Sequence, residues 1–227
     1  MVAPIEEYYN LMKKKLESLG VKGIFLDIDD TISATNLFWA QSHIDNFGNP
    51  EKLTAEEIVR KYRYVSNVPY WNNNKVAEDW IEQHHLSNKG KLELPLVRGA
   101  VESINMIKER LVAYLTGRPQ STISGTKKWL ERCGFPRLDI IAQPSEATLE
   151  QMCLSNGNEW KARVLEYFFP IVEGVIDDNI GLVSHLSSEY RGTIYLFSHE
   201  EIDAPTKVIC CPTWKEVVNA VRSHKEV

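Results

Sequence analysis

The sequence predicts an α/β fold in which helices flank a mostly parallel sheet and a small helical cap subdomain is inserted. Short apolar runs alternate along the chain with segments of helical periodicity, as is typical of βαβ units. The connection between the first two runs, residues 33–96, is far longer than an ordinary crossover. With 227 residues, 43% of them hydrophobic, the chain can bury a large core. The predicted strands are Gly23–Asp27, Leu111–Leu115, Leu138–Ile141, Val172–Ile176, Thr193–Phe197 and Lys207–Cys211.

The N-terminal segment, Pro4–Leu19, has apolar residues at helical spacing with lysines between them. A secretory signal requires a continuous apolar stretch, so this pattern predicts an amphipathic helix that docks on the core. No segment is apolar and long enough to span a bilayer. The four cysteines lack the spacing of metal ligands or of a dense disulfide framework. We therefore expect a cytoplasmic protein with no membrane partner.

The long connection carries helical patterns of its own, which divides the chain into two predicted parts. Residues 1–32 and 97–227 are expected to form the α/β core, and residues 33–96 the cap. Because the connection follows a strand directly, we expect the cap to project over the carboxyl edge of the sheet. Thr54 and Glu57 have the spacing of a helix capping box. The predicted cap helices are Asn36–Phe47, Thr54–Val65 and Lys75–His85.

The first apolar run ends abruptly in two acids, Asp27 and Asp29, spaced two residues apart. Side chains alternate along a strand, so both carboxylates are expected on the same side at the carboxyl edge, where open α/β sheets bind ligands. An acid there can act as a nucleophile, a metal ligand or a proton carrier. The alternative is that Asp30 and Thr31 only cap the next helix. A calcium loop of the EF-hand type is excluded because its required Gly and Glu positions hold other residues.

Two further strands also end in polar groups. The second ends in Thr116, Gly117 and Arg118, whose hydroxyl, backbone N–H groups and guanidinium suit phosphate oxygens. An ordinary turn is the alternative there. The fourth ends in Asp177 and Asp178, which could complete an all-oxygen site for Mg²⁺. A cation is needed at this edge because gathered acids repel each other and an incoming phosphate.

Lys161 lies in the helical stretch that precedes the fourth strand and is the only lysine between Lys128 and Lys207. It is therefore the single candidate for an ammonium group on this side of the sheet, although a lone helical lysine is more often exposed to solvent. The net charge of -5 provides no basic field, so the composition gives no support for a nucleic-acid partner.

Four groups of residues, taken in chain order, resemble the four motifs of the haloacid dehalogenase (HAD) superfamily of phosphohydrolases. They are Asp27 with Asp29 and Thr31, then Thr116, then Lys161, and last Asp177 with Asp178. The resemblance spans nearly the whole chain, and residues 33–96 resemble the helical cap that this superfamily inserts after its first motif. It implies a Rossmann-like core and a phosphatase acting on a small phosphorylated metabolite or a nucleotide. It also implies that Asp27 attacks phosphorus to form an aspartyl-phosphate, that Asp29 carries protons, and that Thr116 and Lys161 hold the phosphoryl oxygens.

The resemblance further implies a Mg²⁺ ion bound by the Asp27 carboxylate, the Asp29 carbonyl and one acid of the fourth motif. We favour Asp178, with Asp177 binding through water or orienting Lys161. A dehalogenase of the same fold needs neither a metal nor the second acid, so Asp29 and the later acids count against it. A phosphomutase would keep all four motifs, and a non-catalytic binding protein would be expected to have lost one of them.

The predicted cap is rich in aromatic residues. Exposed rings could stack on a nucleobase or a sugar, but a small helical cap also needs aromatic bulk for its own core. Arg118 and Lys75 are candidates for contacting a second anionic group of the substrate. The aromatic residues concerned are Trp39, Tyr62, Tyr64, Tyr70, Trp71 and Trp80.

Overall fold

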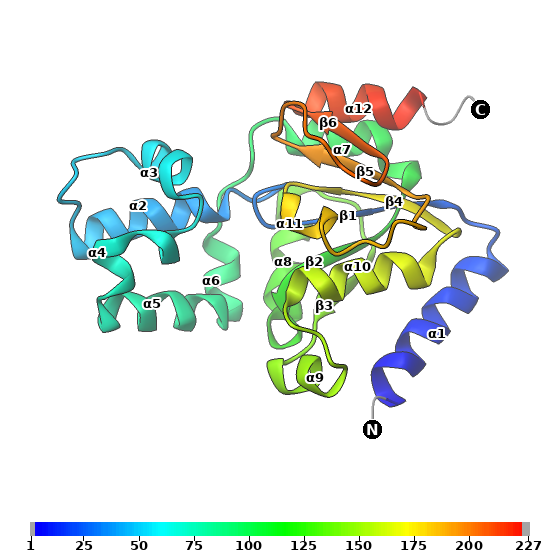
Figure 1. Cartoon of the computed structure of the whole chain (residues 1–227), viewed down its shortest axis with the longest axis horizontal. Coiled ribbons are helices and arrows are strands. Elements are labelled where there is room, and N and C mark those ends of the chain that lie inside the picture. The colour runs from blue at the N-terminus through cyan, green and yellow to red at the C-terminus, as the bar shows by residue number, and fades with distance from the viewer. Residues whose placement is uncertain (1–2, 224–227) are drawn as a thin grey trace.

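A computed structural model describes residues 3–223. It contains a six-stranded, all-parallel sheet of strand order β3-β2-β1-β4-β5-β6 with helices on both faces, which confirms the predicted fold class (Figure 1). Each predicted apolar run forms a strand, with ends that differ by a few residues. The strands are β1 (Gly23–Leu26), β2 (Leu111–Pro119), β3 (Asp139–Gln143), β4 (Val172–Asp177), β5 (Thr193–Phe197) and β6 (Val208–Cys211).

Strand β1 lies at the centre of the sheet, and its side chains alternate between two hydrophobic clusters. Phe25 belongs to the cluster under α1 and α10, whereas Ile24 and Leu26 belong to the cluster under α7, α8 and α12. This alternation follows from the two-residue period of a strand. The core helices are α1 (Ala3–Ser18), α7 (Ala100–Ile107), α8 (Ile123–Cys133), α9 (Glu146–Gln151), α10 (Gly157–Phe168), α11 (Ile180–Val183) and α12 (Trp214–Ser223).

The inserted segment forms a helical subdomain beside the carboxyl end of the sheet, on the left in Figure 1. It has a small buried cluster of its own around Ala40, Ile58 and Trp71. The predicted capping box is present: the Thr54 Oγ accepts from the Glu57 N–H at 3.2 Å, and the Glu57 carboxylate accepts from the Thr54 N–H at 2.7 Å. The helices of this segment are α2 (Thr35–Phe47), α3 (Ala55–Tyr62), α4 (Pro69–Asn72), α5 (Lys75–His85) and α6 (Asn88–Glu93).

Two details of the inserted segment differ from the sequence-based expectation. Helix α3 ends at Tyr62 rather than at Val65, because Arg63 leaves the helical conformation and a short 3₁₀ turn follows. Helix α6 was not predicted, and it packs against α8 of the core. The placement of the domain boundaries at residues 33 and 96 therefore stays a prediction.

The two chain segments that join the inserted helices to the core run side by side directly after β1. Ser33 and Leu96 form an antiparallel bridge, and the Ala34 N–H donates to the Pro95 carbonyl at 2.9 Å. This pairing positions the inserted helices next to the predicted site. No helix among the described residues is long and apolar enough to cross a membrane, and the four cysteines are free thiols.

Candidate active site

Three acids gather where β1 and β4 end. Asp27 follows β1, Asp177 is the last residue of β4, and Asp178 comes next. Because β1 and β4 pair in parallel register, their carboxyl ends meet, and one carboxylate oxygen from each acid lies within 4.8 Å of the others. Asp27 and Asp177 are buried. The structure thus brings together the first and fourth groups of acids that the sequence predicts.

Lys161 enters the same cluster from α10. Its side chain is buried, only 7% exposed, with Nζ 2.6 Å from Asp27 Oδ1 and 2.8 Å from Asp177 Oδ2. Helix α10 packs over the sheet, so this lysine faces the acids rather than solvent. Burial works against the charged ammonium, but the charges of Asp177 and Asp27 outweigh it and raise the pKa of Lys161. The lysine remains protonated and holds two of the acids.

One ammonium does not balance three carboxylates. Burial raises the pKa of Asp27 well above its usual range, and although Lys161 opposes this, repulsion from Asp177 and Asp178 adds to it. The pKa of Asp178 is also raised, first by burial and then by Asp177 and Asp30. A divalent cation would relieve this repulsion, and a cluster of oxygen donors suits hard cations. Asp27, Asp177 and Asp178 could therefore hold a metal ion.

The two later acids differ in what they contact. Asp177 is fully buried, binds Lys161, and accepts from the Asn179 N–H at 2.8 Å. Asp178 borders the cavity above the cluster, and its Oδ1 accepts from the Thr31 hydroxyl at 3.1 Å. Asp178 is thus the acid with access to a ligand, whereas Asp177 fixes Lys161.

Asp30 and Thr31 are not the N-cap of the next helix, because α2 begins at Thr35 after Ala34. The Asp30 carboxylate accepts from the Asn36 backbone N–H at 2.9 Å and from its Nδ2 at 2.6 Å, which ties the acidic turn to α2. Thr31 lies between the acids, because its hydroxyl also approaches Asp27 Oδ2 at 3.4 Å and accepts from the Asp178 N–H at 3.1 Å. Burial raises the pKa of Asp30 to about 7, although the Asn36 hydrogen bond opposes the shift.

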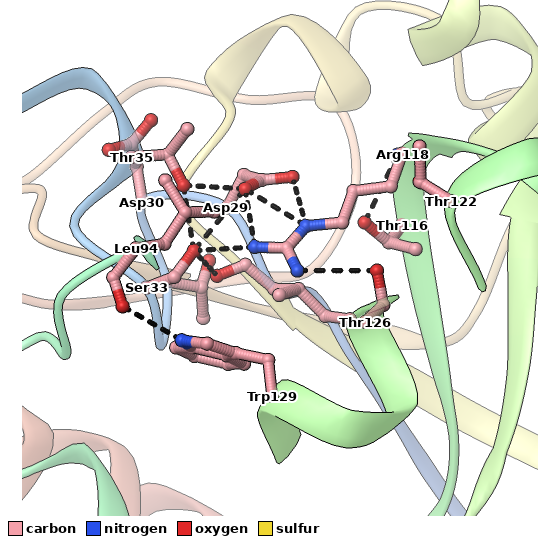
Figure 2. A network of polar contacts seen from close by, with 12 residues as sticks. Asp29, Asp30, Ser33, Thr35, Leu94, Thr116, Arg118, Thr122, Thr126 and Trp129 are labelled. Carbon is pink, nitrogen blue, oxygen red and sulfur yellow. Dashed lines mark hydrogen bonds and ion pairs between the residues drawn. The ribbon is translucent and has the colours of Figure 1, made fainter. Parts of the chain in front are cut away.

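Asp29 forms an ion pair with Arg118. The guanidinium donates from Nε to Asp29 Oδ2 at 3.0 Å and from Nη2 to Asp29 Oδ1 at 2.8 Å (Figure 2). Arg118 is 1% exposed and lies over the Trp129 ring, and the Thr35 hydroxyl donates to Asp29 from the cap side. Burial alone would raise the pKa of Asp29, but the charge and hydrogen bonds of Arg118 hold it well below its usual range.

Of the residues predicted to bind phosphate, some border the cavity above the acids and others are buried beside it. Gly117 borders the cavity, as do Asp27, Asp29 and Lys161. Thr116 is buried, and its hydroxyl accepts from the Arg118 backbone N–H at 3.2 Å (Figure 2). The side chains of Thr116 and Arg118 therefore belong to the polar network beside the cavity. Lys75 lies exposed on α5 in an ion pair with Asp79. The structure therefore supplies no second anion site from Arg118 and Lys75 together.

The cavity above the acids has a volume of about 300 Å³ and lies between the core and the cap. A second cavity, of about 680 Å³, shares His85 and Gln143 with the first and continues between α5 and the β3–α9 loop. Its described lining includes Glu82 and Glu146 but no lysine or arginine. The cap supplies to the first cavity Thr35, Asn36, Trp39, Tyr64 and His85.

Sequence reasoning missed the amide groups of the first cavity, Gln143, Asn156, Asn158 and Asn179. Gln143 ends β3, and Asn156 and Asn179 begin α10 and α11. Only their position in the sequence could have identified them, because each lies at the end of a strand or the start of a helix on the carboxyl edge of the sheet.

The comparisons with known proteins add no assignment. No protein-family model matches the chain, and no curated protein matches it. The geometry of the acidic cluster and the polar cavity carries the functional argument.

Proposed function

We propose that this chain is a Mg²⁺-dependent phosphatase that hydrolyses a phosphate monoester through an aspartyl-phosphate on Asp27. The observation that supports this most is the buried Asp27 carboxylate at the end of β1, 2.6 Å from the Lys161 ammonium and beside Asp178. A carboxylate nucleophile, a fixed cation and a second acid suit phosphoryl transfer through a covalent enzyme intermediate. The order of these residues also follows the HAD motifs.

Mg²⁺ would be held by the carboxylates of Asp27 and Asp178 and by the main-chain carbonyl of Asp29. When bound, the ion supplies positive charge for the phosphoryl oxygens and lowers the repulsion between phosphate and the acids. Asp177 would orient Lys161, in keeping with its burial and its 2.8 Å contact.

Hydrolysis proceeds in two displacements. A carboxylate oxygen of Asp27 attacks phosphorus, the bond from phosphorus to the alcohol oxygen breaks, and that oxygen takes a proton from the general acid. A water oxygen then attacks phosphorus and gives its proton to the same group, now a base, while the bond to Asp27 breaks and phosphate leaves. Lys161 stabilises the phosphoryl charge in both steps.

Asp29 is the proposed proton carrier, and Arg118 controls its availability. In the structure Asp29 is ionised and bound to the guanidinium, so it must be freed before it can donate a proton. Arg118 is buried beside the cavity whereas Asp29 borders it, so release would require the Asp29 carboxylate to turn from the guanidinium toward the substrate. Gly117 and the Thr116 hydroxyl would contact the phosphoryl oxygens from the same side.

The alcohol part of the substrate would extend into the second cavity. Because the described lining there has two acids and no lysine or arginine, a second phosphate or carboxylate is disfavoured. The Trp39 and Tyr64 rings and the amide groups of the first cavity suit a sugar, a nucleoside or another uncharged alcohol. We therefore propose that the substrate is a small phosphorylated metabolite or a nucleoside monophosphate, in either case with an uncharged alcohol part.

The experiment is hydrolysis of an aryl phosphate by the wild type and by Asp27→Asn, each with Mg²⁺ and with EDTA. We expect turnover that requires Mg²⁺ and falls by ~10³-fold or more in Asp27→Asn. Asp203→Asn, which changes an exposed acid, is the matched control and should behave as wild type. Turnover retained in EDTA or in Asp27→Asn would overturn the proposal. Wild-type inactivity on a panel of phosphate monoesters would instead favour a mutase or a binding protein.

A further inference from the structure

The inserted helices have little polar attachment to the core beyond α2 and α6. In the described part of the chain, residues 48–87 make one hydrogen bond to the core and no ion pair with it. In that bond, Arg63 Nη2 donates to the main-chain oxygen of Asp178 at a distance of 3.3 Å. Among the described residues, a single hydrogen bond therefore joins this segment to the acidic cluster.

Arg63 has a backbone conformation that is costly for any residue other than glycine. It follows α3 with φ 64° and ψ -53°, and the Tyr64 N–H donates to the Tyr62 carbonyl at 2.8 Å. These values describe a γ-turn of the rare, strained type. Strained turns persist where the surrounding structure imposes them, and they occur preferentially at functional sites.

The strained turn directs the Arg63 side chain toward the site. Its Nε donates to the Tyr64 hydroxyl at 3.0 Å, and the guanidinium lies 5.4 Å from the centre of the Tyr64 ring. Tyr64 in turn forms part of the cavity wall above Asp27. One residue thus contacts both a wall of the cavity and the backbone of a candidate metal ligand.

The Asp178 carbonyl is held from two sides. His199 Nε2 lies 2.8 Å from the same oxygen that Arg63 binds from the cap. Together with the Thr31 hydroxyl, which binds the Asp178 N–H and carboxylate, these contacts fix the residue on three sides. Of the three contacts, the one from Arg63 depends on the position of the cap.

We propose that Arg63 is a positioning residue that fixes the cap over the acidic cluster through the Asp178 carbonyl, and that the strained turn persists because this contact requires it. The inference rests on the proposed function, since the cap and the cluster together form the phosphatase site. It assigns no proton transfer or phosphate contact to Arg63. Its role is to hold Tyr64 and Asp178 in place.

The test is Arg63→Gly, compared with wild type and with Arg60→Ala, which removes an exposed arginine from the preceding helix, α3. Glycine adopts the turn without strain but lacks the guanidinium. We expect the melting temperature of Arg63→Gly to be equal to or a few degrees above that of wild type, while kcat/KM falls at least ~10-fold, mainly through KM. Arg63→Lys should recover part of the loss, because it keeps one cationic donor.

Hydrogen exchange measured by mass spectrometry provides a readout that does not require turnover. In Arg63→Gly, amides of residues 62–72 and 176–180 should exchange faster, whereas those of α12 should be unchanged. Equal exchange in the two proteins, a kcat/KM within about twofold of Arg60→Ala, or a loss of activity matched by a lower melting temperature would each overturn the positioning role. Failure of the proposed function would appear differently, as an inactive wild type.

Discussion

The ion pair between Arg118 and Asp29 gives a prediction whose size follows from burial. Arg118 is 1% exposed, and the Asp29 side chain is 28% exposed. Replacing Arg118 by methionine keeps apolar contact with Trp129 but removes the guanidinium donors to Asp29. Removing one partner of a buried ion pair costs ~3–5 kcal/mol. Because water reaches part of Asp29, we expect Arg118→Met to lower the free energy of unfolding by about 2–4 kcal/mol at pH 7.

The pH dependence of this loss has a defined sign. In the wild type Arg118 lowers the pKa of Asp29 below its unfolded value, so the stabilisation is complete above a pH of about 4 and is lost as the pH falls further. In Arg118→Met, burial raises that pKa and only the charge of Lys91 and the Thr35 hydrogen bond remain to oppose it, so the folded state loses stability as the pH rises past about 4. The difference between the two proteins should therefore be larger at pH 7 than at pH 4.

Urea denaturation followed by tryptophan fluorescence measures both quantities. Arg110→Met is the matched control, because its pair with Glu173 is more exposed and should contribute less than about 1 kcal/mol. The double variant Arg118→Met/Asp29→Asn should recover much of the loss, since Asp29 no longer carries an uncompensated carboxylate charge. A loss below about 1 kcal/mol at pH 7, or an equal loss at pH 4 and pH 7, would refute the reasoning.

Three further predictions concern the cluster and the second cavity. Asp178→Asn should weaken Mg²⁺ binding by ~10-fold or more, measured by calorimetry, and unchanged affinity would contradict its role as a ligand. Lys161→Met should lower the free energy of unfolding by ~3–5 kcal/mol at pH 7 in urea titrations, because Asp27 and Asp177 lose their counter-charge; a stability equal to wild type would contradict this account. Glu82→Lys/Glu146→Lys should raise kcat/KM for a phosphate ester bearing a carboxylate, relative to an uncharged ester, by ~5-fold or more. An unchanged ratio would remove the argument for an uncharged alcohol part.

Most of the sheet could be predicted from the sequence because each strand is a short apolar run set off by turn residues. The ends of the strands differ from the prediction: β2 continues to Pro119, four residues beyond the predicted end at Leu115. Helix α6 was missed because its short, polar sequence has little apolar periodicity, and its contact with α8 stabilises it. Helix α3 ends at Tyr62, and the turn at Arg63 that follows it includes a hydrogen bond to Asp178, 115 residues away in sequence, which no local pattern contains.

The positions of the acids could be predicted because they follow buried strands directly, and Lys161 because it is the one lysine in the helix before β4. The direction of the Arg118 side chain could not be predicted, because the pairing of β2 with β3 is irregular between Thr116 and Pro119. A regular strand would leave the alternation of side chains readable, whereas this irregularity turns Arg118 toward Asp29. The amide residues of the cavity have no motif, and only the tertiary structure gathers them.

Asp27 is the proposed nucleophile, and locating the phosphoryl group during turnover tests this role directly. Wild-type protein is mixed with an aryl phosphate and Mg²⁺, quenched in acid within milliseconds, digested at low pH, and analysed by peptide mass spectrometry. We expect a transient phosphoryl group on Asp27 that is absent from Asp27→Asn. Turnover with the phosphoryl group on another residue, or turnover that persists in Asp27→Asn, would contradict this role.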